Sequence, residues 1–397
     1  MNTNQTSNPA VGIDDIAFAT GANRIDLAEL AGRFGVEPAK YYVGLGQSEM
    51  SVPAADEDIV TMAAAAAAPI IERHGSDRLR TVLFATESGI DQSKSAGVYV
   101  HRLLGLPQAV RVVELKQACY SATAALQFSA ALVARNPEET VLVIASDVAR
   151  YELHSNAEPT QGAGAVAMLV AADPAILELE TATGVYTQDV MDFWRPNHSA
   201  TAIVDGKLSI SAYQDAIEGA WADYRSRGGA DFSEVDHFCY HQPFTKMAIK
   251  AHRHLAKSLG AGRTQEELDA QIEPTTGYNR RIGNSYTASV YLALLALLDG
   301  DDDLTGRRIA FLSYGSGAVA ECFSGIVRPG YRSALRSDLN RAQLDARTVV
   351  DDARYLQLLE DAASADVHDS DRPRETSAPF RFAGVVGDRR QYEPTSA

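Results

Sequence analysis

One sequence pattern occurs twice in this chain and constrains the fold more than any other feature. Residues 161–170, QGAGAVAMLV, resemble residues 314–323, YGSGAVAECF. Each copy is a Gly-x-Gly turn that leads into an apolar strand. Two copies of one pattern indicate a duplicated chain. Chance similarity between strings of glycine and alanine is the alternative explanation.

The elements that precede each copy support the duplication. We expect the same two elements ahead of both turns, an almost uncharged helix and then an apolar strand. In the first copy the helix is at residues 120–134 and the strand at 140–145. In the second copy the helix is at residues 286–298 and the strand at 308–312. A helix with almost no charge is buried on all sides. The order helix, strand, Gly-x-Gly turn and strand therefore predicts two similar halves, residues 1–175 and 176–330.

Apolar strands also alternate with helical patterns along the rest of the chain. We expect strands at residues 11–17, 81–85, 110–115 and 165–171, and helices at residues 26–34, 57–73 and 96–104. This alternation predicts an α/β protein whose sheets are covered on both faces. Residues 331–397 contain many Arg and Asp and one expected helix at 347–363, so we expect a peripheral and partly flexible extension.

The composition limits the class of protein. The chain has 397 residues, of which 46% are hydrophobic, so it can bury a large core. At roughly 150 residues per domain, it has room for two or three domains. Its three cysteines do not form a disulfide framework. No run reaches the roughly 18 apolar residues of a membrane helix, and the N-terminus lacks the features of a secretory signal. These features predict a cytoplasmic protein without a membrane partner.

The charge and the motifs exclude further classes. A net charge of −16 repels nucleic acid at long range, so we expect no nucleic-acid partner. A few local Lys and Arg side chains can still hold an anionic small ligand. The sequence has neither a GxxxxGK[ST] loop nor a Rossmann GxGxxG turn after a strand. His252 and His254 are too loosely spaced for a metal site, so we expect a surface helix there and no bound metal.

Cys119 lies in a setting that favours chemistry. It follows an expected strand and opens the uncharged helix at 120–134. The unpaired N–H groups and the positive dipole at the start of a helix stabilise a thiolate. A lone cysteine is otherwise a small core residue, and this is how we interpret Cys239 and Cys322, which lie inside expected strands.

Three more polar residues lie at the ends of expected strands and helices. Glu87 follows the strand at 81–85, where ligands bind in open α/β sheets and where desolvation raises the pKa of a carboxylate. His241 follows the strand at 237–240 and can serve as acid, base or hydrogen-bond donor. Asn284 precedes the second uncharged helix, where its amide could stabilise an oxyanion. A cap or surface loop for Glu87, a structural histidine and an N-cap asparagine are the simpler alternatives.

Six parts of the sequence carry a resemblance to a known family. They are ATESGIDQSK (85–94), KQACYSATAAL (116–126), DFWRP (192–196) with VDGKLSISAY (204–213), HQPFTKMAIKA (241–251), GNSYTAS (283–289) and FLSYGSGAVAE (311–321). In this order they resemble the hydroxymethylglutaryl-CoA synthase (HMG-CoA synthase) family of the mevalonate pathway. The resemblance extends from Val11 to about Arg328.

The resemblance implies a fold, an assembly and a reaction. The fold would be thiolase-like, with the duplicated halves forming five layers αβαβα, and the assembly a homodimer. The reaction would condense acetyl-CoA with acetoacetyl-CoA and water to give 3-hydroxy-3-methylglutaryl-CoA and CoA. Both CoA thioesters are substrates, and no cofactor is expected.

The resemblance also implies residue roles. Cys119 would accept the acetyl group, Glu87 would remove a proton from its methyl group, and His241 would position acetoacetyl-CoA and polarise its ketone. The residues that would bind or surround the substrates are Asn284 and Ser316 at the acyl groups, Lys246 at CoA, and Tyr120, Asp147, Thr160, Asp192, Phe193 and Pro243 around the site.

Related chemistries remain as alternatives. A biosynthetic thiolase would carry a second catalytic cysteine, which the SYGSG loop at 313–317 lacks. A ketoacyl-carrier-protein synthase III shares Cys119, His241 and Asn284 but does not need a carboxylate at Glu87. A polyketide β-branching synthase uses the same chemistry on a carrier-bound acyl group, and the residues alone do not separate it. A non-catalytic acyl-CoA-binding protein is opposed by the presence of Cys119, Glu87 and His241 together.

Overall fold

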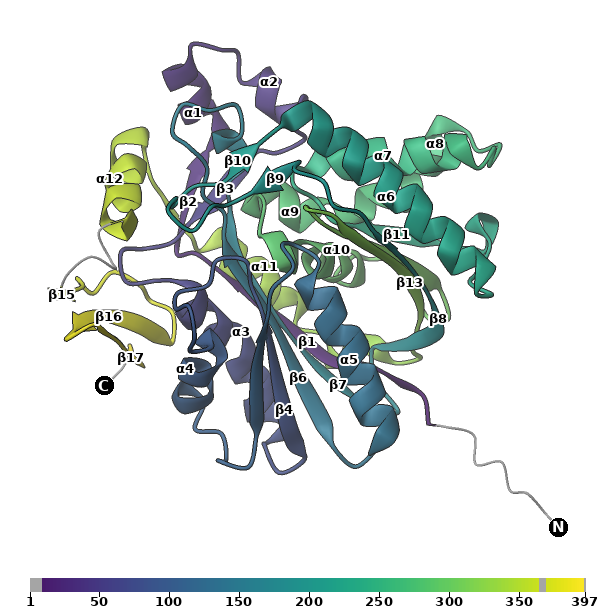
Figure 1. Cartoon of the computed structure of the whole chain (residues 1–397), viewed down its shortest axis with the longest axis horizontal. Helices are drawn as coiled ribbons and strands as arrows, with labels where there is room; N and C mark the ends of the chain where they lie inside the picture. Colours follow the sequence, from purple (N-terminus) through teal and green to yellow (C-terminus); the bar gives the residue numbers. More distant parts are fainter. Residues whose placement is uncertain (1–8, 364–368, 396–397) are drawn as a thin grey trace.

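The main sheet of the computed structural model, which describes residues 9–363 and 369–395, has two parts in which four strands are arranged alike, and β5 extends one of them (Figure 1). The strand order is β11-β12-β13-β8 in one part and β1-β7-β6-β4-β5 in the other. The strands are β1 (Val11–Thr20), β4 (Leu79–Ala85), β5 (Arg111–Leu115), β6 (Thr140–Val148), β7 (Ala163–Ala172), β8 (Leu177–Thr187), β11 (His237–Tyr240), β12 (Arg308–Gly315) and β13 (Val319–Val327).

The pairing directions repeat between the two parts. β1 pairs antiparallel with β7, β7 antiparallel with β6, and β6 parallel with β4. In the same way β8 pairs antiparallel with β13, β13 antiparallel with β12, and β12 parallel with β11. The parts meet where β1 pairs with β8 at Gly12 and Ile13. A Cβ on Gly12 would lie 1.9 Å from the carbonyl oxygen of Leu177, so this close approach requires glycine. The duplication predicted from the sequence is confirmed.

Helices divide the molecule into five layers, αβαβα (Figure 1). The central helices are α5 (Ser121–Arg135) and α10 (Ser289–Leu298), and the outer ones are α3 (Ile59–His74) and α4 (Ala96–Leu103) on one side and α6 (Gly206–Ser226) and α7 (Thr245–Ser258) on the other. Leu126 of α5 and Leu294 of α10 share one apolar core with strands of both sheet parts. The small alanines of α3 let it lie close to β1 and β7.

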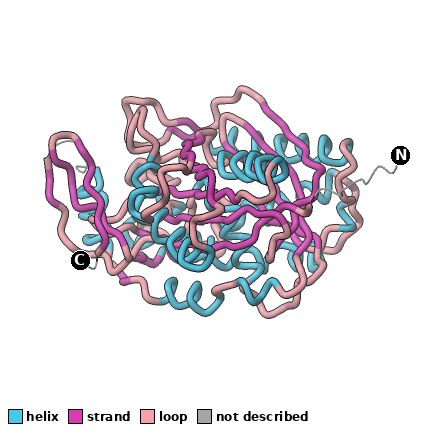
Figure 2. The backbone as a smooth tube through the Cα atoms, turned by 90° about the horizontal axis from the view of Figure 1, so that it is seen from below, coloured by secondary structure: helices cyan, strands magenta, loops and turns pink. Residues whose placement is uncertain are grey.

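Shorter elements surround these layers. They are β2 (Asn23–Asp26), α1 (Leu27–Phe34), α2 (Ala39–Tyr42), β3 (Glu49–Val52), β9 (Phe193–Trp194), β10 (Ile203–Val204), α8 (Gln265–Ile272), α9 (Gly277–Ile282), α11 (Ser337–Asp345), β14 (Thr348–Val349), α12 (Asp352–Ala363), β15 (Ser370–Asp371), β16 (Phe380–Val386) and β17 (Arg389–Pro394). Strands run through the middle of the molecule with helices on both sides, and the β16–β17 hairpin lies at one edge (Figure 2).

Two local predictions are wrong. The helix expected at 347–363 begins only at Asp352, because the β-branched pair Thr348–Val349 forms β14 and pairs with β2. His252 is not on the surface but buried on α7, where it stacks against Phe232 and bonds to Tyr240 and Gln271. The amphipathic pattern of α7 places His252 on its inner face, whereas His254 is half exposed and pairs with a carboxylate on the neighbouring helix.

The segment after residue 330 is more integrated than its composition predicts. Tyr355 and Leu358 of α12 are buried in a core shared with α1, β2 and β3. Phe382 and Tyr392 of the β16–β17 hairpin pack in the core of α3 and α4. Arg381 is buried and pairs with Asp56 ahead of α3. The segment after residue 330 has few apolar residues, but those it has are buried in two cores. It therefore completes these cores and is not the peripheral extension that the composition predicted.

Arg336 provides a test of this integration. Its Nη2 atom lies 2.8 Å from Oδ2 of Asp15, a fully buried carboxylate on β1. Arg73 and His74 also bond to this carboxylate, over 3.1 and 2.9 Å, so the charge stays partly paired without Arg336. A hydrogen bond to a charged group contributes about 1.5 to 3 kcal/mol. We therefore expect Arg336→Ala to lower the free energy of unfolding by about 2 kcal/mol, measured by urea denaturation. Replacement of the exposed Arg389 should change it by less than about 0.5 kcal/mol, and equal stability of both variants would contradict the argument.

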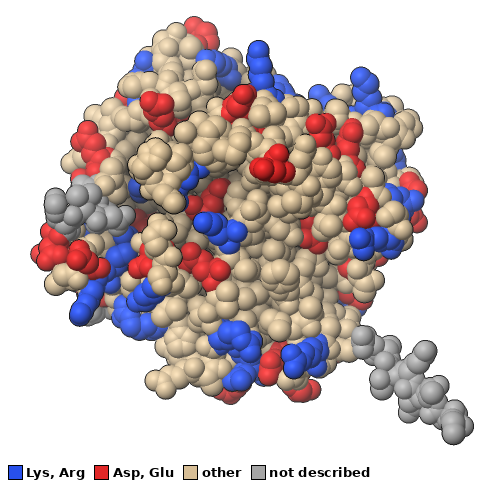
Figure 3. Space-filling model, in the orientation of Figure 1, with Lys and Arg blue, Asp and Glu red and all other residues tan. Residues whose placement is uncertain are grey.

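Charge is mixed over the surface. On the face shown in Figure 3, Lys and Arg side chains lie among Asp and Glu side chains rather than apart from them. Within residues 9–363 and 369–395, no helix is both long and apolar enough to cross a membrane.

Candidate active site

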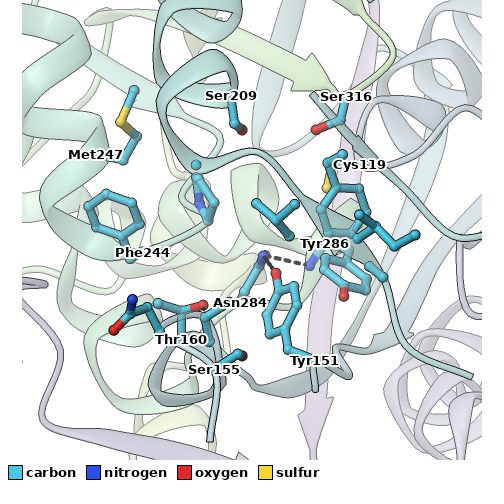
Figure 4. Close-up of a pocket in the computed structure, with 18 of the residues that line it drawn as sticks. Cys119, Tyr151, Ser155, Thr160, Ser209, Phe244, Met247, Asn284, Tyr286 and Ser316 are labelled. Atoms are coloured by element: carbon cyan, nitrogen blue, oxygen red, sulfur yellow. Dashed lines mark hydrogen bonds between the residues drawn. The ribbon is translucent and has the colours of Figure 1, made fainter. Parts of the chain in front are cut away.

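A cavity of about 800 Å³ opens where the two halves of the chain meet (Figure 4). The first half contributes Cys119, Tyr151 and Thr160 to its wall, and the second contributes Asn284 and Ser316. Cys119 and Ser316 lie at one end, while Phe244 and Met247 lie at the other (Figure 4). The cavity therefore has a chemically reactive end and an apolar end.

Cys119 lies two residues before the start of α5, in a turn with an unusual backbone. Ala118 has a φ of 43°, a conformation that few residues other than glycine adopt. The thiol of Cys119 donates a hydrogen bond to Oε1 of Glu87 over 3.0 Å. Burial and the neighbouring Glu87 raise the pKa of the Cys119 thiol. The start of the helix thus does not produce a thiolate as predicted, because desolvation and a nearby carboxylate outweigh the helix dipole.

Glu87 follows β4, as the sequence predicted, and it is held in place from two sides. Burial, and then the negative charge of Asp147, raise the pKa of Glu87 to about 8. Its backbone N–H donates to Oδ1 of Asp147 over 2.9 Å, and its carbonyl accepts from Nη2 of Arg195 over 3.0 Å. A carboxyl group with this pKa exchanges protons near neutral pH, which a general base must do.

Asp147 and Asp192 do not line the cavity but hold segments beside it. Both are fully buried. Asp147 holds the loop at Glu87 and also accepts from the backbone N–H of Thr287 over 3.1 Å. Asp192 accepts from the hydroxyl of Tyr314 over 2.6 Å and from the N–H of Gly317 over 2.9 Å. Each carboxylate thus connects two segments that are distant in the sequence.

His241 lies at the end of β11 and lines the cavity. Burial lowers the pKa of His241 to about 3, so its imidazole is neutral at physiological pH. Its carbonyl accepts from the hydroxyl of Tyr213 over 2.8 Å, which fixes the backbone. Among the described residues, no partner bonds to its buried Nδ1 atom. The ring therefore keeps hydrogen-bonding capacity for a ligand.

Asn284 connects the cavity wall to its neighbours. Its Nδ2 atom donates to the hydroxyl of Tyr151 over 3.2 Å, and its Oδ1 atom accepts from the N–H of Tyr286 over 2.9 Å (Figure 4). Its own N–H donates to the carbonyl of Thr160 over 3.0 Å. Asn284 thus bonds to the backbone two residues on and faces the cavity, but it is not an N-cap as the simpler alternative predicted, because Ser285 precedes the short helix at 286–288 and Ala288 precedes α10.

The other predicted residues divide into two groups. Phe193 and Pro243 line the cavity together with Thr160 and Ser316. Tyr120 and Lys246 do not. The ammonium group of Lys246 donates to the carbonyl of Val43 over 2.9 Å at the surface, beside the cavity-lining Leu45.

Sequence reasoning named Phe193 but missed the two tyrosines with which it forms an aromatic cluster. Tyr151, Tyr286 and Phe193 form edge-to-face contacts beside Cys119, with ring centroids 6.0 to 6.4 Å apart. Tyr286 lies within the GNSYTAS motif, which could have indicated it. Tyr151 belongs to none of the six segments, and only its contact with Asn284 reveals it. These rings form an apolar wall beside the thiol.

Comparisons with known proteins agree with this geometry. The family model for the N-terminal part of hydroxymethylglutaryl-coenzyme A synthase matches residues 8–175, and the model for the C-terminal part matches residues 177–258 and 252–375. The hydroxymethylglutaryl-CoA synthase of Enterococcus faecalis is 41% identical over 384 residues, which is 96% of this chain and 99% of that protein.

Two further relatives widen the comparison. A polyketide biosynthesis 3-hydroxy-3-methylglutaryl-ACP synthase of Bacillus subtilis is 34% identical and is matched over 85% of both chains. A crystal structure of an HMG-CoA synthase complexed with CoA superposes with a TM-score of 0.92 at 37% identity, covering 97% of this chain and 100% of that one. Both matched models and these relatives place the chain in one group: it belongs to the HMG-CoA synthase family.

Proposed function

We propose that the chain condenses acetyl-CoA with acetoacetyl-CoA and water to give HMG-CoA and CoA. One observation carries this function: the Cys119 thiol bonds to the Glu87 carboxyl group, and Cys119 lines the same cavity as the buried, neutral His241. This arrangement combines a nucleophile, a base and a hydrogen-bonding group. The CoA bound to the related HMG-CoA synthase supports CoA thioesters as substrates.

The first step transfers the acetyl group. Glu87 accepts the thiol proton of Cys119, and the sulfur attacks the carbonyl carbon of acetyl-CoA. The new bond joins this carbon to Sγ, and the bond to the CoA sulfur breaks. CoA leaves as its thiol with the proton that Glu87 had accepted, which returns Glu87 to its carboxylate form. The product is acetyl-Cys119.

The second step forms the carbon–carbon bond. Glu87 removes a proton from the acetyl methyl group, and the resulting enolate attacks the ketone carbon of acetoacetyl-CoA. A neutral His241 donates a hydrogen bond or a proton to the oxygen that becomes an alkoxide. Water then cleaves the bond between the acyl group and Sγ, which releases HMG-CoA and restores the thiol. Nothing is oxidised or reduced, so this scheme uses no redox cofactor.

The raised pKa of Glu87 predicts the pH dependence of acetylation. Below pH 8 the carboxyl group is protonated and cannot accept the thiol proton. As the pH rises through about 8, the carboxylate form accumulates, so the acetylation rate should rise about tenfold per pH unit below this value and then level off. Rapid-quench mass spectrometry of Cys119 measures this rate. The inflection should be absent in Glu87→Gln, and a rate independent of pH in the unaltered protein would contradict the assignment.

His241 should act on the acceptor rather than on the donor. We expect His241→Ala to lower kcat/KM for acetoacetyl-CoA by about 100-fold, while acetylation of Cys119 stays within about threefold because the thiol keeps its Glu87 partner. Steady-state kinetics with acetoacetyl-CoA as the varied substrate measures the effect. His254→Ala on the surface of α7 is the matched control. Unchanged kinetics of His241→Ala would remove His241 from the mechanism.

A second candidate function is condensation on a carrier-bound acyl group, which the name of the Bacillus subtilis relative favours. The test is to incubate the protein with acetyl-CoA and acetoacetyl-CoA without a carrier protein and to identify products by mass spectrometry. HMG-CoA and CoA support the first function. Acetylated Cys119 without HMG-CoA indicates a carrier-bound acceptor.

We also propose that the protein is a homodimer. Strand β5 is the last strand at one end of the sheet, and its Val113 is 40% exposed. Phe128 on the adjacent α5 is 55% exposed. An edge strand with exposed apolar neighbours favours pairing with a second copy. Light scattering should give twice the mass of one chain, and a mass of one chain at micromolar concentration would contradict the proposal.

A further inference from the structure

The turn that carries Cys119 lies against the hairpin between β12 and β13. A Cβ on Gly315 would lie 2.6 Å from the carbonyl oxygen of Gln117 and 2.7 Å from the nitrogen of Tyr120. The amide of Gln117 donates to the carbonyl of Ser316 over 3.2 Å. The second half of the chain therefore holds the backbone around the nucleophile of the first half.

Glu321 extends this contact into the interior. Tyr120 donates a hydrogen bond from its hydroxyl to Oε2 of Glu321 over 2.7 Å. Glu321 is only 4% exposed, and burial raises its pKa to about 7. Its neighbours Ala320 and Cys322 pack in the outer core beside α6 and α7, so the alternation of β13 directs Glu321 to the central layer. A carboxyl group there costs stability compared with an apolar residue, and the fold alone gives no reason for it.

The turn has few other constraints on the side chain of Tyr120. It is the residue before α5, and no side-chain hydrogen bond caps this helix there. The positive φ of Ala118 is a strained conformation that persists only when surrounding contacts fix it. The Tyr120–Glu321 bond is such a contact, on the residue next to the nucleophile.

We propose that Glu321 is a positioning residue for Cys119. Acting through Tyr120, it fixes the turn so that the thiol points at Glu87 and at the incoming thioester. This inference rests on the proposed function, since it assigns Glu321 to the acetylation step. A misplacement of the nucleophile by about 1 Å can cost about 100-fold in rate, so a loosened turn has a measurable effect.

The experiment is a double-mutant cycle with Glu321→Ala, Tyr120→Phe and the double variant, read out by single-turnover acetylation of Cys119. We expect each single variant to acetylate about tenfold more slowly at saturating acetyl-CoA, with an unchanged KM for acetyl-CoA. The double variant should be no slower than the slower single variant. Glu321→Gln should restore at least about half the rate, since its amide oxygen still accepts the Tyr120 hydrogen bond.

The matched control is Glu180→Ala. Glu180 is a carboxylate of β8 in the same half, bonded to Arg308 and Ser324 and outside the cavity. The Glu180→Ala variant loses a carboxylate of the sheet but keeps the bond between Tyr120 and Glu321. Its acetylation rate should therefore be normal. Thermal unfolding of each variant separates misplacement of the turn from loss of folded protein.

Three results would overturn the proposal. They are a normal acetylation rate in Glu321→Ala, single effects that multiply in the double variant, and slow acetylation in Glu321→Gln equal to that of Glu321→Ala. If Glu321→Ala does not fold, a normal rate in Tyr120→Phe overturns it instead. Failure of the proposed function gives a different result. If the unaltered protein acetylates Cys119 but forms no HMG-CoA, acetoacetyl-CoA is not the acceptor, and the role of Glu321 in acetylation can still be tested.

Discussion

Replacement of Cys119 by alanine is expected to abolish acetyl transfer and to reduce HMG-CoA formation by about 10⁵-fold or more. The other groups cannot compensate, because the scheme forms its carbon–carbon bond from an acetyl group held on Sγ. Without the thiol, Glu87 has lost both its hydrogen-bonding partner and the covalent substrate on which it acts. Intact-protein mass spectrometry after incubation with acetyl-CoA should detect one acetyl group in the unaltered protein and none in Cys119→Ala.

A second cysteine provides the control for this experiment. Cys239 is fully buried in β11, and burial raises the pKa of its thiol well above its usual range. Cys239→Ala should therefore become acetylated on Cys119 at a normal rate, apart from any loss of stability. Acetylation of Cys119→Ala at another position, with HMG-CoA still formed, would show that the nucleophile is misassigned.

Replacement of Glu87 by alanine is expected to separate the two chemical steps. Condensation should fall by about 10⁴-fold, since a positioned base contributes about 10²- to 10⁴-fold and the methyl group of a thioester is a weak acid. Acetylation should fall by only about 10- to 100-fold, because solvent can still accept a thiol proton slowly. Acetylated enzyme should therefore accumulate in Glu87→Ala, and quenching followed by peptide mass spectrometry measures it.

The control for Glu87 is a carboxylate that lines the cavity itself. Glu152 lines the cavity but is exposed, so it lacks the dry surroundings of a buried base. Glu152→Gln should keep condensation within about threefold of normal. If Glu87→Ala instead condenses as fast as the unaltered protein, the base is a different group, and the 3.0 Å contact with Cys119 has only a structural role.

The sequence predicted the fold well where the pattern is long and apolar. The two Gly-x-Gly strands and the two uncharged helices recur as equivalent elements, and α10, which has no charged residue, is central as expected. Prediction failed where short segments depend on distant partners. Thr348 and Val349 form a strand only because β2 lies beside them, and Tyr355 is buried only because α1 and β3 complete its surroundings.

The site was predictable to a similar extent. The ends of β4 and β11 and the start of α5 could be located from the sequence, and these give Glu87, His241 and Cys119. The direction of the Cys119 pKa shift could not be predicted from the sequence. It depends on the carboxylate of Glu87, which is 32 positions away in the chain and becomes a neighbour only on folding. Asp147 and Asp192 were predicted near the site, but only the structure shows them supporting loops behind it.

The seam between the two halves has a consequence for how the chemistry is shared. Glu87 follows β4 just as His241 follows β11, its counterpart in the other half. The same position in the two copies thus holds the base that acts on the acetyl group in one copy and the polar group that acts on acetoacetyl-CoA in the other. Neither copy holds both, so the reacting atoms approach each other only as accurately as the two halves are aligned. The pairing of β1 with β8 and the apolar core that α5 and α10 share with both sheet parts maintain this alignment, so they support the chemistry without touching a substrate.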